Sequence, residues 1–346
     1  MRYAIIVVTM LLAALPARAA DGIPDLPAPV ANNAVASVTV EGRDHIFSFM
    51  GLGPGKTHTD IVKSAYMLRT GDAVWQQLPD VPVAEGRLAA TAVGLNGRVW
   101  LFGGYTVAAN GNEKSTPEVF AFDPLSLKYM RAPDMPLPVD DAVSFAYLDR
   151  YIYLVSGWHD TDNVRAVQVL DTQTMHWFSA SDYPGTPVFG HAGGIIGNRF
   201  VIADGVAVKG RDAAGRRRFD TVNEGWMGTI DPANPALIAW RRLPQLPGRG
   251  HYRMAGAGIA ALSRVVFVGG TPDAYNYSGV GYGGQPAIPT SHVFAWDFAA
   301  DKWTVMPSRA VPSMDHRGLV RLEGRWFTLG GMTAAQQISR LVLSIR

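Results

Sequence analysis

Residues 90–104 have the sequence ATAVGLNGRVWLFGG, in which two short apolar runs flank Asn96-Gly97 and the second run ends in Gly103-Gly104. An Asn-Gly pair suits a two-residue hairpin turn, because both central positions need left-handed backbone angles. Residues 90–95 and 98–102 are therefore predicted to form two antiparallel strands. Residues 118–122 and the stretch around Tyr129 continue the pattern as a third and a fourth strand. The unit is predicted to be a four-stranded antiparallel sheet.

Two features of this unit recur along the chain with a step of about 50 residues. In the first, an apolar strand ends in a glycine-containing pair, at Met50-Gly51, Gly103-Gly104, Ser156-Gly157, Asp204-Gly205, Gly269-Gly270 and Gly330-Gly331. In the second, an aromatic residue precedes a proline-rich exit, at Trp75, Tyr129, Trp177, Trp240 and Trp303. The glycines permit unusual backbone angles and the aromatics are expected to pack between sheets. A repeat of this length and content predicts the blades of a β-propeller.

The number of repeats predicts six blades. The chain ends in residues 341–345, which match a third strand, whereas residues 23–30 (IPDLPAPV) match the end of a fourth strand with no partners before them. We therefore expect the N-terminal strand to complete the sixth blade, which leaves no sheet edge unpaired. The prediction is an all-β, six-bladed propeller that forms a single domain over residues 21–346.

The N-terminus carries the pattern of a cleaved signal peptide over residues 1–20. Arg2 is followed by an apolar run over residues 4–15 and by Ala17-Arg18-Ala19, and the run is too short to span a bilayer. The protein is therefore expected to be periplasmic or secreted, without membrane insertion once the peptide is removed. Its removal takes away two arginines from a formal charge of +2, and a neutral chain argues against nucleic acid as a partner.

Antiparallel connectivity predicts where a binding site lies. The loops that follow the glycine pairs and the loops that join one blade to the next emerge on one face of the disc. The loops over residues 206–223 and 271–290 are the longest of the first kind. The loops between blades carry polar residues that are expected near the axis, among them Arg87, Asp141, His191, Tyr252, Arg253, His316 and Arg317.

These residue types suit a polyhydroxylated or acidic small molecule. Aromatic side chains that could stack on a sugar ring lie in the same set of loops: Tyr105, Trp158, Tyr275, Tyr277 and Tyr282. The alternative is structural, because each arginine could simply pair with a neighbouring carboxylate or donate to a loop carbonyl.

The repeat resembles the kelch family and, within it, the bacterial sialic acid mutarotases (N-acetylneuraminate epimerases). Those proteins are also exported, have six blades, and begin with a Pro-Asp-Leu-Pro strand similar to residues 24–27. In that family a fourth-blade Asn-Gly-Glu stretch, followed by Lys and Arg, supplies an acid/base glutamate and an arginine that anchors the substrate carboxylate. Residues 203–211 read ADGVAVKGR, so Lys209 and Arg211 match the basic part and Val206 stands where the glutamate is expected.

Because valine cannot transfer a proton, the resemblance predicts a mutarotase only if another group replaces the glutamate. The candidates for this catalytic role are Glu224, His191 and His316. A second resemblance is to galactose-oxidase-like propellers, but the copper chemistry of that enzyme requires a cysteine, which this chain does not contain. Neither a metal nor another cofactor is expected.

Two functions remain open from the sequence. The first is a sugar mutarotase or epimerase that acts on sialic acid or a related sugar, with Arg87, Asp141, Lys209, Arg211, Tyr252, Arg253, Tyr275 and Arg317 as substrate-binding residues. The second is a non-catalytic propeller that binds a glycan or a protein partner in the cell envelope.

Overall fold

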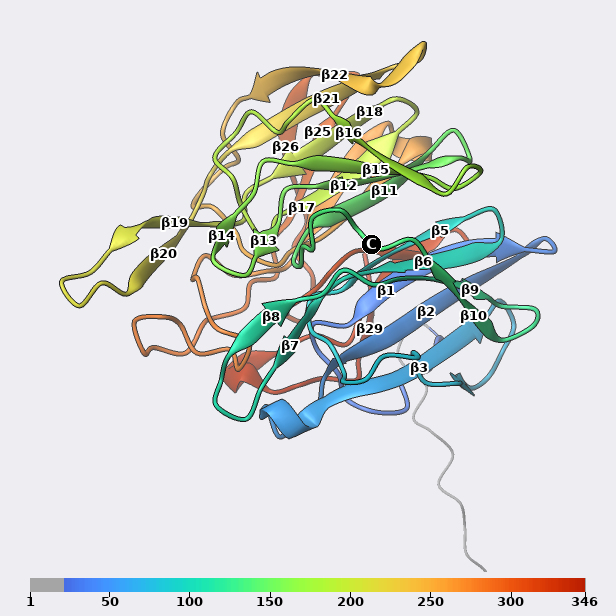
Figure 1. The fold of residues 1–346 in the computed structure, drawn as a ribbon, viewed down its shortest axis with the longest axis horizontal. Helices are drawn as coiled ribbons and strands as arrows, with labels where there is room; N and C mark the ends of the chain where they lie inside the picture. The colour runs from blue at the N-terminus through green and yellow to red at the C-terminus, as the bar shows by residue number, and fades with distance from the viewer. Residues whose placement is uncertain (1–21, 346) are drawn as a thin grey trace, which may run out of the picture.

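A computed structural model describes residues 22–345 and shows a β-propeller of six blades (Figure 1). The predicted signal peptide, residues 1–20, lies outside the described residues. The helices of the described part are three single turns, η1 (His58–Asp60), η2 (Ala260–Leu262) and η3 (Ala334–Gln336). No helix there has the length and hydropathy needed to cross a membrane.

The strands follow one order in every blade. The innermost strands are β1 (Ala34–Val40), β5 (Thr91–Leu95), β11 (Val143–Tyr147), β17 (Ala192–Ile196), β23 (Ala255–Ile259) and β27 (Val320–Leu322). The second strands are β2 (Arg43–Leu52), β6 (Arg98–Phe102), β12 (Tyr151–Val155), β18 (Arg199–Ala203), β24 (Arg264–Val268) and β28 (Arg325–Leu329). The third strands are β3 (Ile61–Arg69), β9 (Val119–Asp123), β15 (Val167–Asp171), β21 (Gly225–Asp231), β25 (Val293–Asp297) and β29 (Val342–Ser344).

The fourth strands are β4 (Gln76–Leu78), β10 (Lys128–Ala132), β16 (His176–Ala180), β22 (Asn234–Leu243) and β26 (Lys302–Met306). All pairings within the blades are antiparallel. The four strands predicted from the sequence around Asn96-Gly97 agree with β5, β6, β9 and β10, and their bounds differ little. The predicted fold class is confirmed.

The glycine pairs adopt left-handed backbone angles at both positions in all six blades. The first position tolerates a side chain, as at Ser156 with φ of 55°. The second does not, because a Cβ atom on Gly157 would lie 2.7 Å from the carbonyl oxygen of Asp140, and the one on Gly51 would lie 2.6 Å from that of Ala31. Glycine is required there both by the angle and by the close approach of the next chain.

A ring of backbone hydrogen bonds joins the six blades around the axis. In each blade, one residue in the segment that leads into the innermost strand has a left-handed φ between 52° and 67°. These ring residues are Asn32, Ala89, Asp141, Gly190, Arg253 and Asp315. The N–H of each of the first five donates to the carbonyl of its counterpart in the preceding blade, at 2.7–3.3 Å, and the N–H of His316 donates to Arg253 to complete the circle. The ring fixes five side chains and one glycine next to the axis.

Aromatic residues of the fourth strands connect neighbouring blades at the periphery. The indole N–H of Trp177 donates to the carbonyl of Pro133 at 3.0 Å, and that of Trp303 donates to Pro244 at 2.7 Å. The equivalent Trp75 of the first blade donates to Pro24 at 2.9 Å. Pro24 therefore occupies the position of a proline that leaves a fourth strand.

The N-terminal segment lies beside the last strand of the chain. The N–H of Leu26 donates to the carbonyl of Arg340 at 2.9 Å, the N–H of Val342 donates to the carboxylate of Asp25 at 3.1 Å, and Leu26 is buried. These contacts confirm that the N-terminal segment completes the sixth blade beside β29.

We predict that Gly157→Ala destabilises the protein more than Gly210→Ala does. Both glycines have a strongly positive φ, of 114° and 125°, but only Gly157 faces a neighbouring carbonyl, whereas nothing lies within 4 Å of a Cβ atom on Gly210. The shared left-handed angle costs an alanine about 1–2 kcal/mol, and the clash at Gly157 adds about 1–3 kcal/mol. Urea denaturation of the two variants measures the difference, and equal losses of free energy of unfolding would contradict it.

Candidate functional site

One face of the propeller carries almost all the elaborated connections. The hairpins β7–β8 (Tyr105–Val107 and Glu113–Ser115), β13–β14 (Trp158–His159 and Asp162–Asn163) and β19–β20 (Val206–Arg211 and Arg217–Thr221) project on the same side, at the left of Figure 1. The loop over residues 271–290 of the fifth blade covers the same face. The stretch expected to be a long loop, residues 206–223, is thus mostly a β-hairpin with a turn at residues 212–216.

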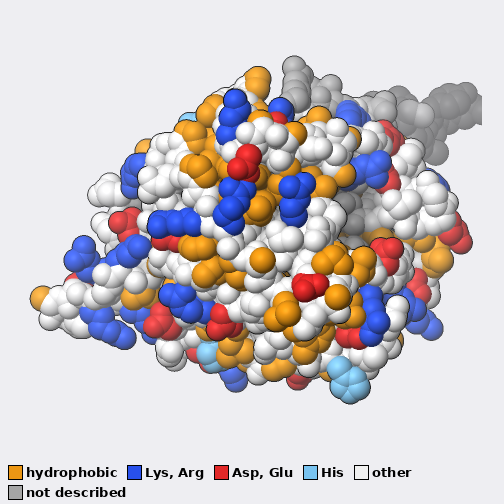
Figure 2. All heavy atoms as spheres, turned by 90° about the horizontal axis from the view of Figure 1, so that it is seen from above, with side chains coloured by type: hydrophobic (Ala, Val, Ile, Leu, Met, Phe, Trp, Pro, Cys, Tyr) orange, Lys and Arg blue, Asp and Glu red, His pale blue; other side chains and the backbone are white. Residues whose placement is uncertain are grey.

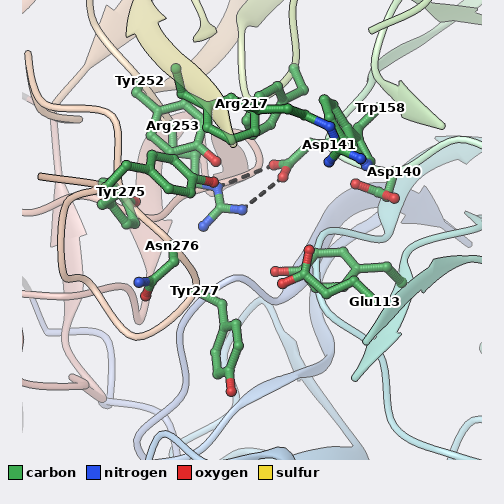
Figure 3. A pocket seen from close by; sticks show the side chains of 14 residues that line it. Glu113, Asp140, Asp141, Trp158, Arg217, Tyr252, Arg253, Tyr275, Asn276 and Tyr277 are labelled. Carbon is green, nitrogen blue, oxygen red and sulfur yellow. Dashed lines mark hydrogen bonds and ion pairs between the residues drawn. The ribbon is translucent and has the colours of Figure 1, made fainter. Parts of the chain in front are cut away.

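These connections enclose a pocket of about 190 Å³ above the backbone ring (Figure 3). Its walls are aromatic: Tyr105, Trp158, Phe189, Phe219, Tyr252, Tyr275, Tyr277 and Tyr282. Its polar groups are Glu113, Asp140, Asp141, Arg217, Arg253 and Asn276. All five aromatic residues that the sequence placed in this set of loops line the pocket.

The floor of the pocket is a buried ion cluster built by ring residues. Arg253 donates from Nη2 to Asp141 at 2.7 Å and from Nη1 to Asp315 at 2.8 Å, and Arg317 also pairs with Asp141. The Tyr275 hydroxyl donates to Asp315 at 3.1 Å. Burial opposes ionisation of Asp141, but Arg253 and Arg317 outweigh it and hold its pKa below the usual value. Asp141 is therefore a charged structural partner.

Arg253 also lies against two aromatic rings. Its guanidinium carbon is 4.7 Å from the centre of the Tyr252 ring and 5.3 Å from that of Tyr275. Cation–π contacts of this kind are strengthened when both partners are desolvated. They hold the two tyrosines at the pocket wall.

Two carboxyl groups of the pocket have raised pKa values. Burial, followed by the neighbouring charge of Asp141, raises the pKa of Asp140 well above its usual range, against one hydrogen bond from the Ser115 hydroxyl at 2.6 Å. Glu113 is exposed as a residue, but partial desolvation of its carboxyl by the pocket walls raises its pKa, while Arg253 and Arg217 oppose the rise. Such groups are suited to proton transfer near neutral pH.

Two polar groups of the pocket have no partner among the described residues. The buried Nε of Arg217 and the buried hydroxyl of Tyr252 make no hydrogen bond, and Arg217 forms no ion pair within 4.0 Å. The guanidinium of Arg217 lies over the Trp158 ring, 5.1 Å from its centre. A buried donor without a partner is costly, so both groups are suited to a ligand.

Lys209 and Arg211, the predicted anchors, do not line the pocket. Both are exposed in β19, and Arg211 donates to the carbonyl of Gly215 at 2.8 Å within its own hairpin. Figure 2 shows Lys and Arg side chains around the projection at the left, where Figure 1 places this hairpin. Arg217, on the partner strand β20, reaches the pocket instead.

The three predicted catalytic residues lie away from the pocket lining. Glu224 accepts hydrogen bonds from the Thr186 hydroxyl at 2.8 Å and from the Trp226 indole at 3.1 Å. The bond from Thr186 connects the segment after the third blade to the fourth blade. Burial opposes the charge of Glu224, but these bonds prevail and lower its pKa. His191 is buried with Nε2 2.9 Å from the Val155 carbonyl. His316 is buried with Nε2 2.7 Å from the Ser313 hydroxyl.

The remaining predicted binding residues divide between floor, wall and interior. Asp141, Tyr252, Arg253 and Tyr275 line the pocket, and Arg317 supports it from below through Asp141. Arg87 is buried elsewhere and pairs with Glu118 at 2.7 Å. Val206 is fully buried and pairs with Phe189 through two backbone hydrogen bonds, so the position expected to hold a glutamate belongs to the core.

One signal in the sequence could have revealed Asp140. The residue before each ring residue pairs with the residue after the glycine pair, and in the other five blades it is apolar: Ala31, Leu88, Phe189, Tyr252 and Met314. Asp140 is the exception among the six. Glu113 has no such signal, because it lies on a hairpin that differs between blades. Arg217 lies in a basic cluster of the fourth blade that includes Arg216 and Arg218, and guanidinium groups there could clamp a carboxylate, but the sequence does not show which of them faces the pocket.

Comparisons with known proteins agree with this architecture. The Kelch motif family matches residues 86–136. Kelch-like protein 15 of Mus musculus is 23% identical over 279 residues, which cover 79% of this chain and 43% of that protein. Kelch-like protein 15 of Gallus gallus is 28% identical over 148 residues, 42% of this chain and 29% of that protein. The match thus spans less than half the length of these curated relatives.

A solved structure gives the same result for the fold. The structure of YjhT superposes with a TM-score of 0.73, at 16% sequence identity, and covers 93% of this chain and 96% of that one. The fold defines a six-bladed propeller with a pocket on its elaborated face. The chain has the fold of a kelch-type β-propeller, and its residues 86–136 match the Kelch motif.

We predict that Arg253→Met lowers the free energy of unfolding by about 3–5 kcal/mol, because it leaves Asp141 and Asp315 buried with fewer partners. The matched control is Arg241→Met, which breaks an exposed ion pair with Asp301 and costs about 1 kcal/mol or less. Urea denaturation at pH 7 measures both. Equal effects would show that the floor cluster does not stabilise the ring.

We also predict that His191 makes the fold sensitive to acid. Burial lowers its pKa from 6.5 to about 4, against a hydrogen bond to Val155 that raises it. The unfolded chain therefore binds this proton at a higher pH than the folded protein does. The free energy of unfolding falls by about 3 kcal/mol as the pH decreases from about 6.5 to about 4. His191→Gln should flatten this part of the stability profile, whereas His176→Gln, at an exposed position in β16, should leave it unchanged. A profile unchanged by His191→Gln would contradict the prediction.

Proposed function

We propose that the pocket on the hairpin-bearing face binds a small acidic sugar and catalyses the exchange of its anomers. The observation that carries the proposal is the combination of two carboxyl groups with raised pKa values and one unpaired arginine within a single aromatic-walled pocket. Anomer exchange of a sugar ring requires stacking surfaces, a proton donor and a proton acceptor.

Asp140 and Glu113 supply the two proton-transfer roles. Anomer exchange opens the ring when its oxygen gains a proton while the anomeric hydroxyl loses one, and closure on the other face reverses both transfers. Asp140, more deeply buried, retains a proton to donate, and Glu113, which remains solvent accessible, accepts one. Both groups recover their starting states, so no cofactor is consumed.

Arg217 is the proposed anchor for the sugar carboxylate. A guanidinium offers a planar fork to a carboxylate, and within residues 22–345 Arg217 has no carboxylate within 4.0 Å, in contrast to Arg253. The resemblance to sialic acid mutarotases supports a carboxylate-bearing sugar. In this chain we place the anchor on β20 and the acid/base pair on the second and third blades.

A second candidate is a non-catalytic propeller that binds a glycan or an envelope protein. The stacking of Phe219 on the exposed Tyr282, with ring centres 4.3 Å apart, favours it, because an aromatic surface of this kind can bind a glycan without proton transfer. For both candidates we propose an exported protein in the periplasm or outside the cell, in accord with the pattern of residues 1–20.

The test follows the anomeric proton signals of freshly dissolved N-acetylneuraminic acid and of neutral sugars by NMR, with and without the protein. We expect faster equilibration for the acidic sugar. Glu113→Gln should reduce the rate by about 100-fold or more, since a positioned acid or base contributes about that much. Arg217→Met should raise KM, and Arg216→Met, which breaks an exposed ion pair with Asp212 in the same hairpin, is the control.

The outcomes separate the candidates. Loss of activity in Arg211→Met but not in Arg217→Met would place the anchor at the hairpin tip, as the family resemblance implies. No acceleration for any sugar, together with ligand line broadening that Tyr282→Ala removes, would favour the binding propeller.

A further inference from the structure

A channel runs along the axis of the propeller beneath the ion cluster. It has a volume of about 270 Å³ and is lined by residues of all six innermost strand regions. Glycines form much of its wall, at Gly94, Gly193, Gly194, Gly256, Gly258 and Gly318. The space is therefore bounded largely by backbone, which leaves room for a small ion or for water.

Arg317 lies among the residues that line this channel. Of the described residues in the lining, Arg317 is the only one with a charged side chain. The sixth blade thus places a guanidinium beside a channel whose other lining residues are uncharged. The Arg317 side chain is only 4% exposed.

The donors of this guanidinium are largely unused. Nη1 of Arg317 pairs with Asp141, but Nε and Nη2 are buried and have no hydrogen-bond partner in the described residues. Arg253, in contrast, uses Nε and Nη2 on Asp141 and Nη1 on Asp315. Buried donors without a protein partner require water or an ion.

We propose that the axial channel holds a small monovalent anion, of the halide or nitrate class, on Nε and Nη2 of Arg317. This site is separate from the sugar pocket, because the ion cluster of Arg253, Asp141 and Asp315 lies between them. The hydroxyls of Thr91 and Ser144, 2.7 Å apart, also line the channel and can turn a proton toward the ion.

The charges around Arg317 define the class of anion. Two arginines, Arg253 and Arg317, face two carboxylates, Asp141 and Asp315, so the cluster has little net charge to offer. The nearby imidazoles, His191 and His316, have pKa values lowered mainly by burial and carry no charge at neutral pH. A divalent anion would leave excess charge buried, whereas a weakly hydrated monovalent ion matches a weakly hydrated guanidinium.

The test uses bromide. Crystals of the wild-type protein soaked in sodium bromide should show an anomalous peak within hydrogen-bond distance of Nε and Nη2 of Arg317. Arg317→Lys keeps the positive charge beside Asp141 but lacks the fork, and it should lose the peak. Arg321→Met, in a neighbouring pocket that shares Gly94 and Trp326 with the channel, is the control and should keep it.

Solution measurements remove the dependence on crystals. Bromide NMR lines should broaden with the wild-type protein, and the broadening should be lost with Arg317→Lys and reversed by excess nitrate. The proposal is overturned by a wild-type channel without a bromide peak, or by a peak that Arg317→Lys retains. No sugar enters this experiment, so its result is independent of the function proposed for the pocket.

Discussion

The structure depends on the ring of backbone hydrogen bonds that links six left-handed residues around the axis. A left-handed angle costs a residue with a Cβ atom about 1–2 kcal/mol, yet five of the six positions hold such a residue. The hydrogen bonds between blades and the close approach of the glycine pairs fix this conformation. As a result, five of the six positions place a side chain next to the axis, and four of these five are polar or charged.

The ring also explains how a repeated fold carries a unique site. Symmetry would place six equal side chains at the axis, but the positions hold Asn32, Ala89, Asp141, Gly190, Arg253 and Asp315. Arg253 of the fifth blade reaches two carboxylates because the ring positions of the third and sixth blades, Asp141 and Asp315, are acidic. Gly190 leaves space that the Tyr252 ring approaches. The ion cluster therefore forms the floor of the pocket. Aromatic side chains from the hairpins of the second, third and fourth blades and from the loop of the fifth blade form its walls.

The sequence predicted the architecture well because its determinants are local and repeated. Glycine pairs, hairpin turns and the aromatic before each proline exit are visible within one repeat, and Pro24 could be assigned to the sixth blade by the same pattern. The site was predicted only in part. Asp141, Tyr252, Arg253 and Tyr275 were found because they lie near the glycine pairs and ring positions, whereas Glu113 and Arg217 lie on hairpins whose direction no repeat specifies. The family resemblance pointed to Lys209 and Arg211, but alternation along β19 and β20 directs Arg217 inward.

We propose that the function of the propeller resides in the pocket above the ring, with a carboxylate held by Arg217. This is best tested by a crystal structure of the protein with bound N-acetylneuraminic acid. We expect the sugar carboxylate at Arg217, the sugar ring against the aromatic wall, and Glu113 and Asp140 beside the anomeric centre. A sugar bound at the exposed tip of hairpin β19–β20, or no bound sugar at saturating concentration, would contradict it.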